Sequence, residues 1–569
     1  MSSIDWIVTL FTLVSIIVYG IWKSRKTKTL ETYLLADRSL PWYHVTLSVM
    51  ATQASAITFL SAPGQAYSDG MRFIQFYFGL PLATIILCAA FVPIFHQMKV
   101  FTAYQYLEER FDGKTRRLTA LLFLLQRGLS TGITIYAPAI VLSQILHIPV
   151  NLTIVLNAIL VIVYTVYGGT KAVSYTQVLQ MLIIFSGLLL AGYLVVHKLP
   201  MDIGLSEALD IAGIAGRTKS LDTHFDPNNK FNLWSGLIGG LFLQLSYFGT
   251  DQSQVGRYLT GRSVNESRLG LFVNGIVKIP MQFSILMIGA LVFSFYHFTA
   301  PPVFFNQHAL ETVDSGPLKI NSQLIQSQFN DVNLLRHQHA KGFIEAQRNG
   351  NKDVEVVCRG LIKEDNRQLD TLRKQFVTLL KKESPTADLN DSNYVFLYFV
   401  THELPRGVVG LLIAVIFLAA MGSTASGLNS LASSTMVDFV QKYTSADQQE
   451  MAKVATTRWL TVAWGVFCMC VAFFASKVGN LIEAVNILGS LFYGVILGIF
   501  LTAFLFKKIK GGSVFYAAIA AEISVVLMWY FNLTAFLWLN LIGCILVMVL
   551  TLALELFKEG APARSTSSD

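Results

Sequence analysis

Long uncharged apolar runs recur from one end of this 569-residue chain to the other. About 20 apolar residues suffice for a helix to cross a bilayer, and in lipid only helices and closed barrels satisfy every backbone polar group. Charged residues make up 14% of the chain, against about 25% in a typical soluble domain. The sequence therefore predicts an all-α polytopic membrane protein. We expect 13 transmembrane helices, at 5–22, 42–66, 71–96, 118–146, 149–168, 173–197, 232–252, 268–298, 404–439, 455–476, 480–506, 512–531 and 534–557.

The short loops between these runs carry Lys and Arg on one side only. Such a bias marks the cytoplasmic side, so the odd number of spans predicts an N-terminus outside and a C-terminus inside, in the plasma (inner) membrane. The first run is expected to stay as an anchor, because its basic residues follow the apolar stretch and no cleavage site appears. The basic residues are Lys23, Arg25, Lys26, Lys28, Lys99, Arg110, Lys114, Arg116, Arg117, Lys171, Arg257, Arg262, Arg268, Lys442, Lys453, Lys507, Lys508 and Lys510.

One long polar loop, residues 299–403, falls on the predicted outer side. Apolar residues at helical spacing predict two amphipathic helices, 318–347 and 353–383, separated at Asn349-Gly350-Asn351. We expect a helical hairpin over the outer mouth, whose role the sequence leaves open. The tail 558–569 is small and polar, and is predicted to be disordered.

Several polar and helix-breaking groups lie inside the apolar runs. The stretch 419–435 is rich in hydroxyls, which must bond their own helix, another helix or an ion. Gly and Pro interrupt 51–64, 246–250 and 489–498. An interrupted helix is tolerated where its backbone lines a cavity or packs in protein, and paired interruptions in two halves of a transporter indicate a substrate site. Close packing through Gly is the alternative at each.

Other classes of function find little support in the sequence. The net charge of +8 is spread over loops and does not form a nucleic-acid footprint. No catalytic motif is present, so an enzyme is not expected. Cys358 stands alone in a polar loop, which speaks against a disulfide framework. His337 and His339 are expected to be solvated surface residues. No obligate protein partner is evident.

Four motifs resemble the sodium:solute symporter family: ATQASAITFLSAPGQAY (51–67), YGGTKAVSYTQVLQ (167–180), SYFGTDQSQVGRYL (246–259) and AAMGST (419–424). The first, with TGITIYAPAI (131–140), is most similar to the iodide, monocarboxylate and multivitamin carriers. The resemblance covers 5–557 except the outer loop. It implies five-plus-five inverted repeats of the leucine-transporter type, here 42–197 and 232–506, with extra helices at 5–22 and 512–557.

The resemblance also implies a sodium site. Its ligands would be the carbonyls of Ala51, Ala54 and Ala420 and the hydroxyls of Ser423 and Thr424. Family members with a second sodium site carry an Asp where this chain has Gln177, and a hydroxyl partner is replaced by Gly427, although Ser426 remains. We therefore expect one sodium per cycle.

The substrate pocket is implied in the same way. By resemblance Tyr247 corresponds to an aromatic inner gate, with Phe248 beside it, and the pocket-lining candidates are Gln53, Gln244 and, more weakly, Gln75 and Tyr77. Arg127 lies deep in its predicted span, where a charge marks function by default. Arg binds carboxylates through its planar fork, and no intramembrane Asp or Glu is an obvious partner. A structural Arg bonded to backbone carbonyls is the alternative.

The expected function is sodium-coupled import of a small organic solute by alternating access, with a carboxylate as the favoured substrate. A neutral sugar, an amino acid, a vitamin or an inorganic anion stays open as the cargo, and proton coupling stays open as the driving force. A transporter-like membrane sensor is the alternative from another class. Sodium, the solute and the bilayer are the expected partners.

Overall fold

The computed structural model describes residues 1–569 except 25–28, 201, 386, 442–449 and 560–569. The predicted basic residues Arg25, Lys26, Lys28 and Lys442, and all but two residues of the predicted tail, lie outside the described residues. Helices make up nearly all of the regular structure. The elements of the first half are α1 (Ser3–Ser24), α2 (Leu30–Leu35), η1 (Ala36–Arg38), α3 (Trp42–Gln53), α4 (Ala56–Asp69), η2 (Met71–Tyr77), α5 (Leu80–Ile86), η3 (Leu87–Phe91), α6 (Val92–Gln97), α7 (Gln105–Arg110), α8 (Gly113–Leu146), α9 (Val150–His197), α10 (Leu205–Ile214), η4 (Ser235–Gly239), α11 (Gly240–Gly249), α12 (Gln252–Tyr258) and α13 (Val264–Phe298).

The second half begins with the helices of the polar loop, of which α15 and α16 are the longest, and ends with five long apolar helices. They are α14 (Gln307–Ser315), α15 (Lys319–Arg348), α16 (Lys352–Glu383), η5 (Asp391–Asn393), α17 (Val395–Glu403), α18 (Val408–Ser434), η6 (Thr435–Val440), α19 (Glu450–Ala472), η8 (Ala475–Lys477), α20 (Leu481–Leu505), α21 (Gly511–Tyr530) and α22 (Phe536–Glu559).

The apolar helices confirm a multi-span membrane protein. Eleven helical segments are long and apolar enough to cross a membrane, and the bent pair α3–α4 makes a twelfth span. The thirteenth expected span, 232–252, is shorter than expected: it consists of η4 and α11, which end at Gly249. The long helix α9 holds two of the spans, because Gly169 takes a φ of +56° that breaks it.

The interruptions read from the sequence have two different causes. The 51–64 stretch is broken at Ala54–Ser55, where α3 and α4 meet at 60°. Gly64 lies inside continuous α4, and a Cβ there would collide with the carbonyl of Ser392. The predicted interruption at 489–498 is wrong: α20 runs through it, and Gly494 lets the backbone of α22 approach, since a Cβ would stand 2.6 Å from the carbonyl of Asn540.

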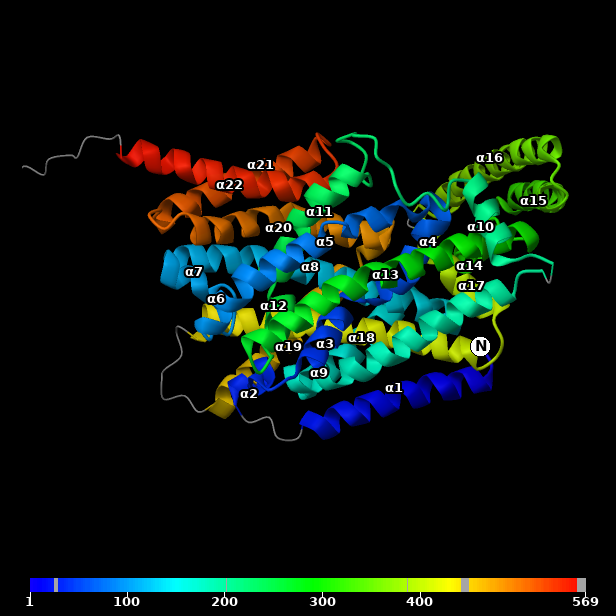
Figure 1. The fold of residues 1–569 in the computed structure, drawn as a ribbon. Coiled ribbons are helices and arrows are strands. Elements are labelled where there is room, and N and C mark those ends of the chain that lie inside the picture. Colours follow the sequence, from blue (N-terminus) through cyan, green and yellow to red (C-terminus); the bar gives the residue numbers. More distant parts are fainter. Residues whose placement is uncertain (25–28, 201, 386, 442–449, 560–569) are drawn as a thin grey trace, which may run out of the picture.

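The predicted hairpin is present and lies at one end of the bundle. α15 and α16 match the expected 318–347 and 353–383 within a few residues, and Gly350 turns the chain between them with a φ of +66°. Figure 1 shows this pair beyond the ends of the long helices, at the end we call the hairpin end. The N-terminus lies at the hairpin end, and α22 runs toward the opposite end.

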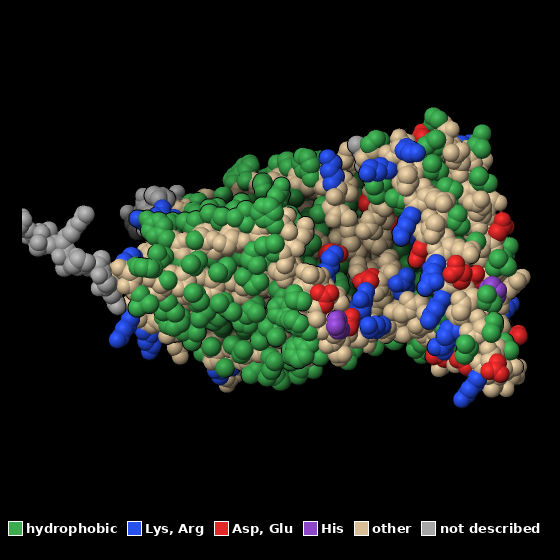
Figure 2. All heavy atoms as spheres, turned by 90° about the horizontal axis from the view of Figure 1, so that it is seen from above, with side chains coloured by type: hydrophobic (Ala, Val, Ile, Leu, Met, Phe, Trp, Pro, Cys, Tyr) green, Lys and Arg blue, Asp and Glu red, His purple; other side chains and the backbone are tan. Residues whose placement is uncertain are grey.

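Surface composition follows the same division. Figure 2 shows hydrophobic side chains over the long helices, and Lys, Arg, Asp and Glu gathered toward the hairpin end around a hollow. A membrane span needs an apolar exterior, whereas a solvated hairpin needs charge. Among the described spans, α18 is the most buried, with 83% of its apolar window inside the protein. The hydroxyl-rich helix is therefore the centre of the bundle.

Candidate functional site

The break between α3 and α4 lies against the central helix α18. Ala54 has non-helical dihedrals, and its N–H donates to the carbonyl of Met50 at 2.8 Å. A Cβ built on Gly422 of α18 would stand 3.8 Å from the carbonyl oxygen of Ala51. The sequence motifs at 51–55 and 419–424 thus meet in space, as a site made from carbonyls and hydroxyls requires.

The hydroxyls of α18 point into its own helix or toward this junction. Ser423 Oγ donates to the carbonyls of Ala419 and Ala420, at 2.9 and 3.2 Å. A hydroxyl that donates its proton keeps its lone pairs free to accept or to ligate a cation. Thr424 is buried, and its hydroxyl makes no hydrogen bond among the described residues. Neutral oxygens suit a hard monovalent cation.

Gln177 occupies the junction of α3, α9 and α18. Ser48 Oγ donates to its Oε1 at 2.6 Å, and its Nε2 donates to Ser426 Oγ at 2.8 Å and to the carbonyl of Gly422 at 3.1 Å. The oxygens around Nε2 are the kind that would surround a cation. An uncharged amide N–H₂ stands in that place and satisfies them.

Gln180, one turn further along α9, has no such partners. Its side chain is fully buried, and both amide atoms lack a hydrogen-bond partner among the described residues. Its Oε1 would stand 2.6 Å from a Cβ on Gly422. Nothing in the sequence marks this residue beyond its place in the 167–180 motif, yet its unsatisfied amide faces the same junction.

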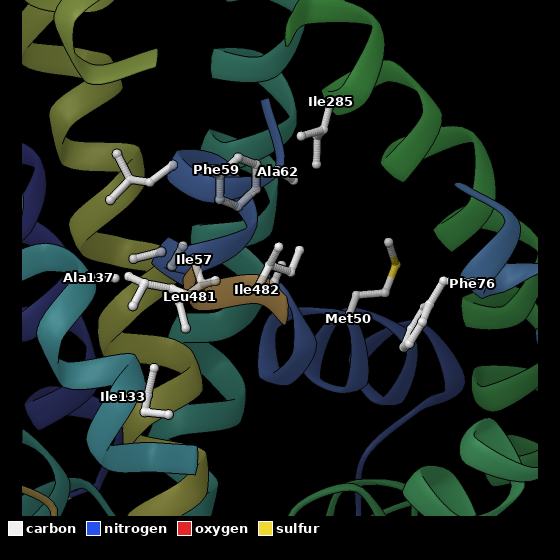
Figure 3. Close-up of a cluster of buried hydrophobic side chains, with 14 of the residues drawn as sticks. Met50, Ile57, Phe59, Ala62, Phe76, Ile133, Ala137, Ile285, Leu481 and Ile482 are labelled. Atoms are coloured by element: carbon white, nitrogen blue, oxygen red, sulfur yellow. The ribbon is translucent and has the colours of Figure 1, made fainter. Parts of the chain in front are cut away.

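A cavity of about 110 Å³ lies beside the break. Of the residues proposed for substrate, Gln53, Gln244, Tyr247 and Arg127 line it, as does Tyr77. Gln53 Nε2 donates to Asn274 Oδ1 at 3.1 Å, which fixes its amide at the wall. Figure 3 shows apolar side chains from several helices around the break; among them Ile57, Phe76 and Ile482 also line the cavity.

Two residues proposed for substrate do not line the cavity. Phe248 is fully buried behind Tyr247, with their rings 5.1 Å apart. Gln75 joins two connecting segments, because its Nε2 donates to the carbonyl of Phe231 and its Oε1 accepts from the N–H of Asp222, both at 3.0 Å. The structure places both side chains in packing roles next to the cavity wall.

The expectation that Arg127 lacks an acidic partner is wrong. Its guanidinium forms an ion pair with Asp251, which follows the end of α11. Tyr493 Oη donates to the same carboxylate at 2.7 Å, and the guanidinium lies over the Tyr247 ring at 5.5 Å. Asp251 falls at the end of the predicted span 232–252 but beyond the observed end of α11, so its approach to Arg127 depends on how the chain turns after Gly249.

Lys278 is the charged cavity residue that the sequence analysis missed. It lies in the middle of α13, is 1% exposed, and lines the cavity. Among the described residues its ammonium has no hydrogen bond or ion pair, and it lies over the Tyr77 ring, 5.6 Å from the ring centroid. The signal available in the sequence was a single Lys in the middle of a long apolar run.

The chain is similar to known carriers over most of its length. A human sodium/iodide cotransporter is 30% identical over 47% of this chain, which spans 41% of that protein. The sodium/sialic acid symporter SiaT of Proteus mirabilis is 26% identical over 98% of this chain and 95% of its own. A sodium-coupled monocarboxylate transporter 1 of Xenopus laevis is 24% identical over 85% of this chain and 64% of its own. These relatives are transporters and not enzymes.

The fold has a solved counterpart. The substrate-bound, outward-open structure of a Na⁺-coupled sialic acid symporter superposes with a TM-score of 0.74 at 22% identity, covering 98% of both chains. The model of the sodium:solute symporter family matches residues 33–332 and 374–521. Between these two parts it leaves out 333–373, which comprises the turn of the hairpin and the adjoining parts of α15 and α16. With its broken helix, hydroxyl-rich central helix and polar cavity, this chain belongs to the sodium:solute symporter family.

Proposed function

We propose that this protein imports a small anionic solute, with a carboxylate as the favoured class, together with one sodium ion per cycle. The anionic class is proposed because of Lys278, a buried ammonium at the wall of a cavity whose described lining residues include no Asp or Glu. A buried charge without a partner is costly, and an anionic ligand removes that cost. Iodide, sialic acid and monocarboxylates in the names of the relatives are anions of this kind.

Arg127 has a different part in this proposal. Because Asp251 and Tyr493 already hold its guanidinium, Arg127 adds no unbalanced charge to the cavity. The guanidinium of Arg127 lies against the ring of Tyr247, whose hydroxyl accepts a hydrogen bond from Gln254 Nε2 at 2.6 Å. We assign Arg127, Asp251 and Tyr247 to a barrier on the side away from the hairpin, which a substrate carboxylate loosens by competing for the guanidinium.

The sodium site is proposed at Ala51, Ala54, Ala420, Ser423 and Thr424. Support comes from the unwound turn beside α18 and from hydroxyls that keep acceptor lone pairs free. Gln180 is a further candidate ligand because its buried amide oxygen is unsatisfied. The proposed ratio of one sodium rests on Gln177, whose amide already fills a second position.

Transport would follow from rocking of the repeats 42–197 and 232–506 around this site. Sodium bound at the break orders the turn that carries Gln53 and Ser55 to the cavity, so each ligand raises the affinity of the other. We propose that the hairpin end faces outside, as the basic loops indicate. The cavity is small beside the roughly 300–1,000 Å³ typical of drug-sized sites, which favours a solute of few atoms.

The test is uptake of labelled pyruvate, sialate, pantothenate, glucose, proline and iodide into proteoliposomes, with and without an inward sodium gradient. Sodium-driven uptake confined to anions is the expected result. Sodium-driven uptake of glucose or proline would be consistent with the sodium site and would refute the anionic substrate class. Uptake that is the same with and without the sodium gradient would refute sodium coupling.

A further inference from the structure

A second cavity lies at the hairpin end, about 590 Å³ in volume and separate from the central one. Its inner wall is made by Tyr67 at the end of α4, Arg217 after α10, and Phe293 of α13. Its outer wall is made by α15 and α16, including Arg336 and Arg373. Most of this outer wall belongs to 333–373, the segment outside the family match.

Unsatisfied donors mark this cavity. Arg217 Nε, Arg336 Nε and Asn366 Nδ2 are buried and have no hydrogen-bond partner among the described residues. All three residues line the cavity. Each of these atoms is an N–H donor, and no buried acceptor oxygen of a lining residue is left unsatisfied among the described atoms. Donors without acceptors call for a ligand that only accepts, and an anion is such a ligand.

The charged residues around the cavity also favour an anionic ligand. Four basic residues line it (Arg217, Arg336, Arg373 and Lys374) against two acids, Asp370 and Asp391. Asp391 is already committed, since it accepts from Arg373 at 2.6 Å and from the N–H of Phe305 at 2.8 Å. An excess of positive charge is left facing the hollow.

Among the three arginines that line the cavity, Arg217 has the fewest partners in the described structure. It forms no ion pair, and its guanidinium lies 5.0 Å from the Phe293 ring. The nearby Asp69 pairs instead with Arg72, at 2.5 Å. Burial lowers the pKa of Arg217, and it lowers the pKa of Arg336 to about 10. Asp370 favours the charged form of both guanidinium groups but does not offset the cost of burial, so each is left with less counter-charge than a buried cation needs.

We infer that the hairpin and the ends of α4 and α13 form a second anion site, in which Arg217, Arg336 and Asn366 bind a small anion such as the carboxylate of an arriving solute. Long cationic walls around a hollow raise the local concentration of anions. The site would collect the solute before it reaches the central cavity. This collecting role rests on the proposed anionic substrate; the binding site itself does not.

The test is fluorine NMR of the full-length protein in nanodiscs, with trifluoroacetate as the carboxylate probe and trifluoroethanol as the neutral control. Line broadening by trifluoroacetate is measured for Lys278→Gln, which removes the central cation. It is measured again after adding Arg217→Gln, or Arg367→Gln as an exposed control on α16. We expect Lys278→Gln to keep broadening, Arg217→Gln to cut it at least threefold, and Arg367→Gln to leave it unchanged.

The outcomes separate this site from the central one. Loss of all broadening in Lys278→Gln would overturn the second site and would be consistent with anion binding in the central cavity alone. Unchanged broadening after adding Arg217→Gln, in protein with an unaltered unfolding temperature, would show a water-filled cavity and overturn it too. Restored broadening in Arg217→Lys supports a charge effect. Displacement by sodium chloride would assign the site to inorganic anions, and persistence would assign it to carboxylates; either supports an anion site.

Discussion

Two buried cations near one cavity differ in what surrounds them. Arg127 has Asp251 and a Tyr hydroxyl within hydrogen-bonding reach, while the ammonium of Lys278 lies over an aromatic ring. A paired ion is neutral to its surroundings, whereas an unpaired one attracts whatever anion enters. In the proposed function, recognition of the anion therefore falls to Lys278, which the sequence did not mark, and not to Arg127, which it did.

Replacement of Lys278 by Gln is expected to raise the KM for an anionic substrate by roughly 10- to 100-fold, which is the loss of a charged hydrogen bond of about 1.5–3 kcal/mol. Lys278→Arg keeps the charge and should retain much of the uptake. Initial rates in proteoliposomes measure both. An unchanged KM for every transported anion in Lys278→Gln would exclude its contact with substrate.

Ser423→Ala is expected to raise the half-saturating sodium concentration about tenfold or more, because it removes one cation ligand. Ser430→Ala is the matched control: Ser430 Oγ bonds the carbonyls of Ser426 and Gly427 in the same way, two turns along the helix. Sodium activation curves for the two variants provide the comparison. Equal sodium dependence in both would place the ion elsewhere.

At the scale of helices, Gly residues mark both breaks and contacts. Gly169 breaks α9 because its positive φ does not fit a continuous helix. Gly494 and Gly64 instead lie in continuous helices, where they allow other segments to approach closely. Spacing along the chain cannot separate these cases, because the deciding atoms belong to distant residues, Asn540 and Ser392. The true break at Ala54–Ser55 carries neither Gly nor Pro.

A buried carboxyl group lies where the chain returns from the hairpin to the bundle. Asp388 lies between α16 and η5 and lines a cavity with Tyr136 of α8. Burial, helped by nearby Asp391, raises the pKa of Asp388 to about 7 from its ordinary value of about 4. The folded protein then binds a proton that the unfolded chain has lost, so stability falls as pH rises from about 4 to 7.

Asp388→Asn removes this dependence. The wild-type unfolding temperature is expected to fall more between pH 5 and pH 8 than that of the variant, which should be the more stable of the two at pH 8. Thermal unfolding of the purified protein across that range measures the difference. Parallel pH profiles would show that Asp388 ionises at the same pH in both states.

For the whole carrier, the proposed ratio fixes the response to voltage. One sodium with one monoanion moves no net charge, so a tenfold sodium gradient supports about tenfold accumulation, or about 1.4 kcal/mol, at any potential. A second sodium would add about 2.3 kcal/mol per 100 mV. Uptake at imposed potassium diffusion potentials is therefore expected to be independent of voltage. Steep voltage dependence with a monoanion would contradict the ratio.

Much of the architecture was predictable because lipid imposes one rule on every span. The membrane class, the hairpin helices α15 and α16 and the break within 51–64 follow from apolar length, periodicity and motif. The pairing of Arg127 with Asp251 was not, since 124 residues separate them. The same holds for the placement of Phe248 and Gln75 outside the cavity. Those depend on rotations of helices that no local pattern encodes.

Gln177 has one more consequence, for the return of the empty carrier. An ion leaves its site once per cycle, but a side-chain amide is covalently fixed and stays. The contacts of Gln177 with Ser48, Ser426 and Gly422 would therefore survive the release of sodium, and would hold α3, α9 and α18 together during the unloaded half of the cycle. Because this junction contains no exchangeable ion, we expect it to stay formed whether or not sodium is bound at the proposed site.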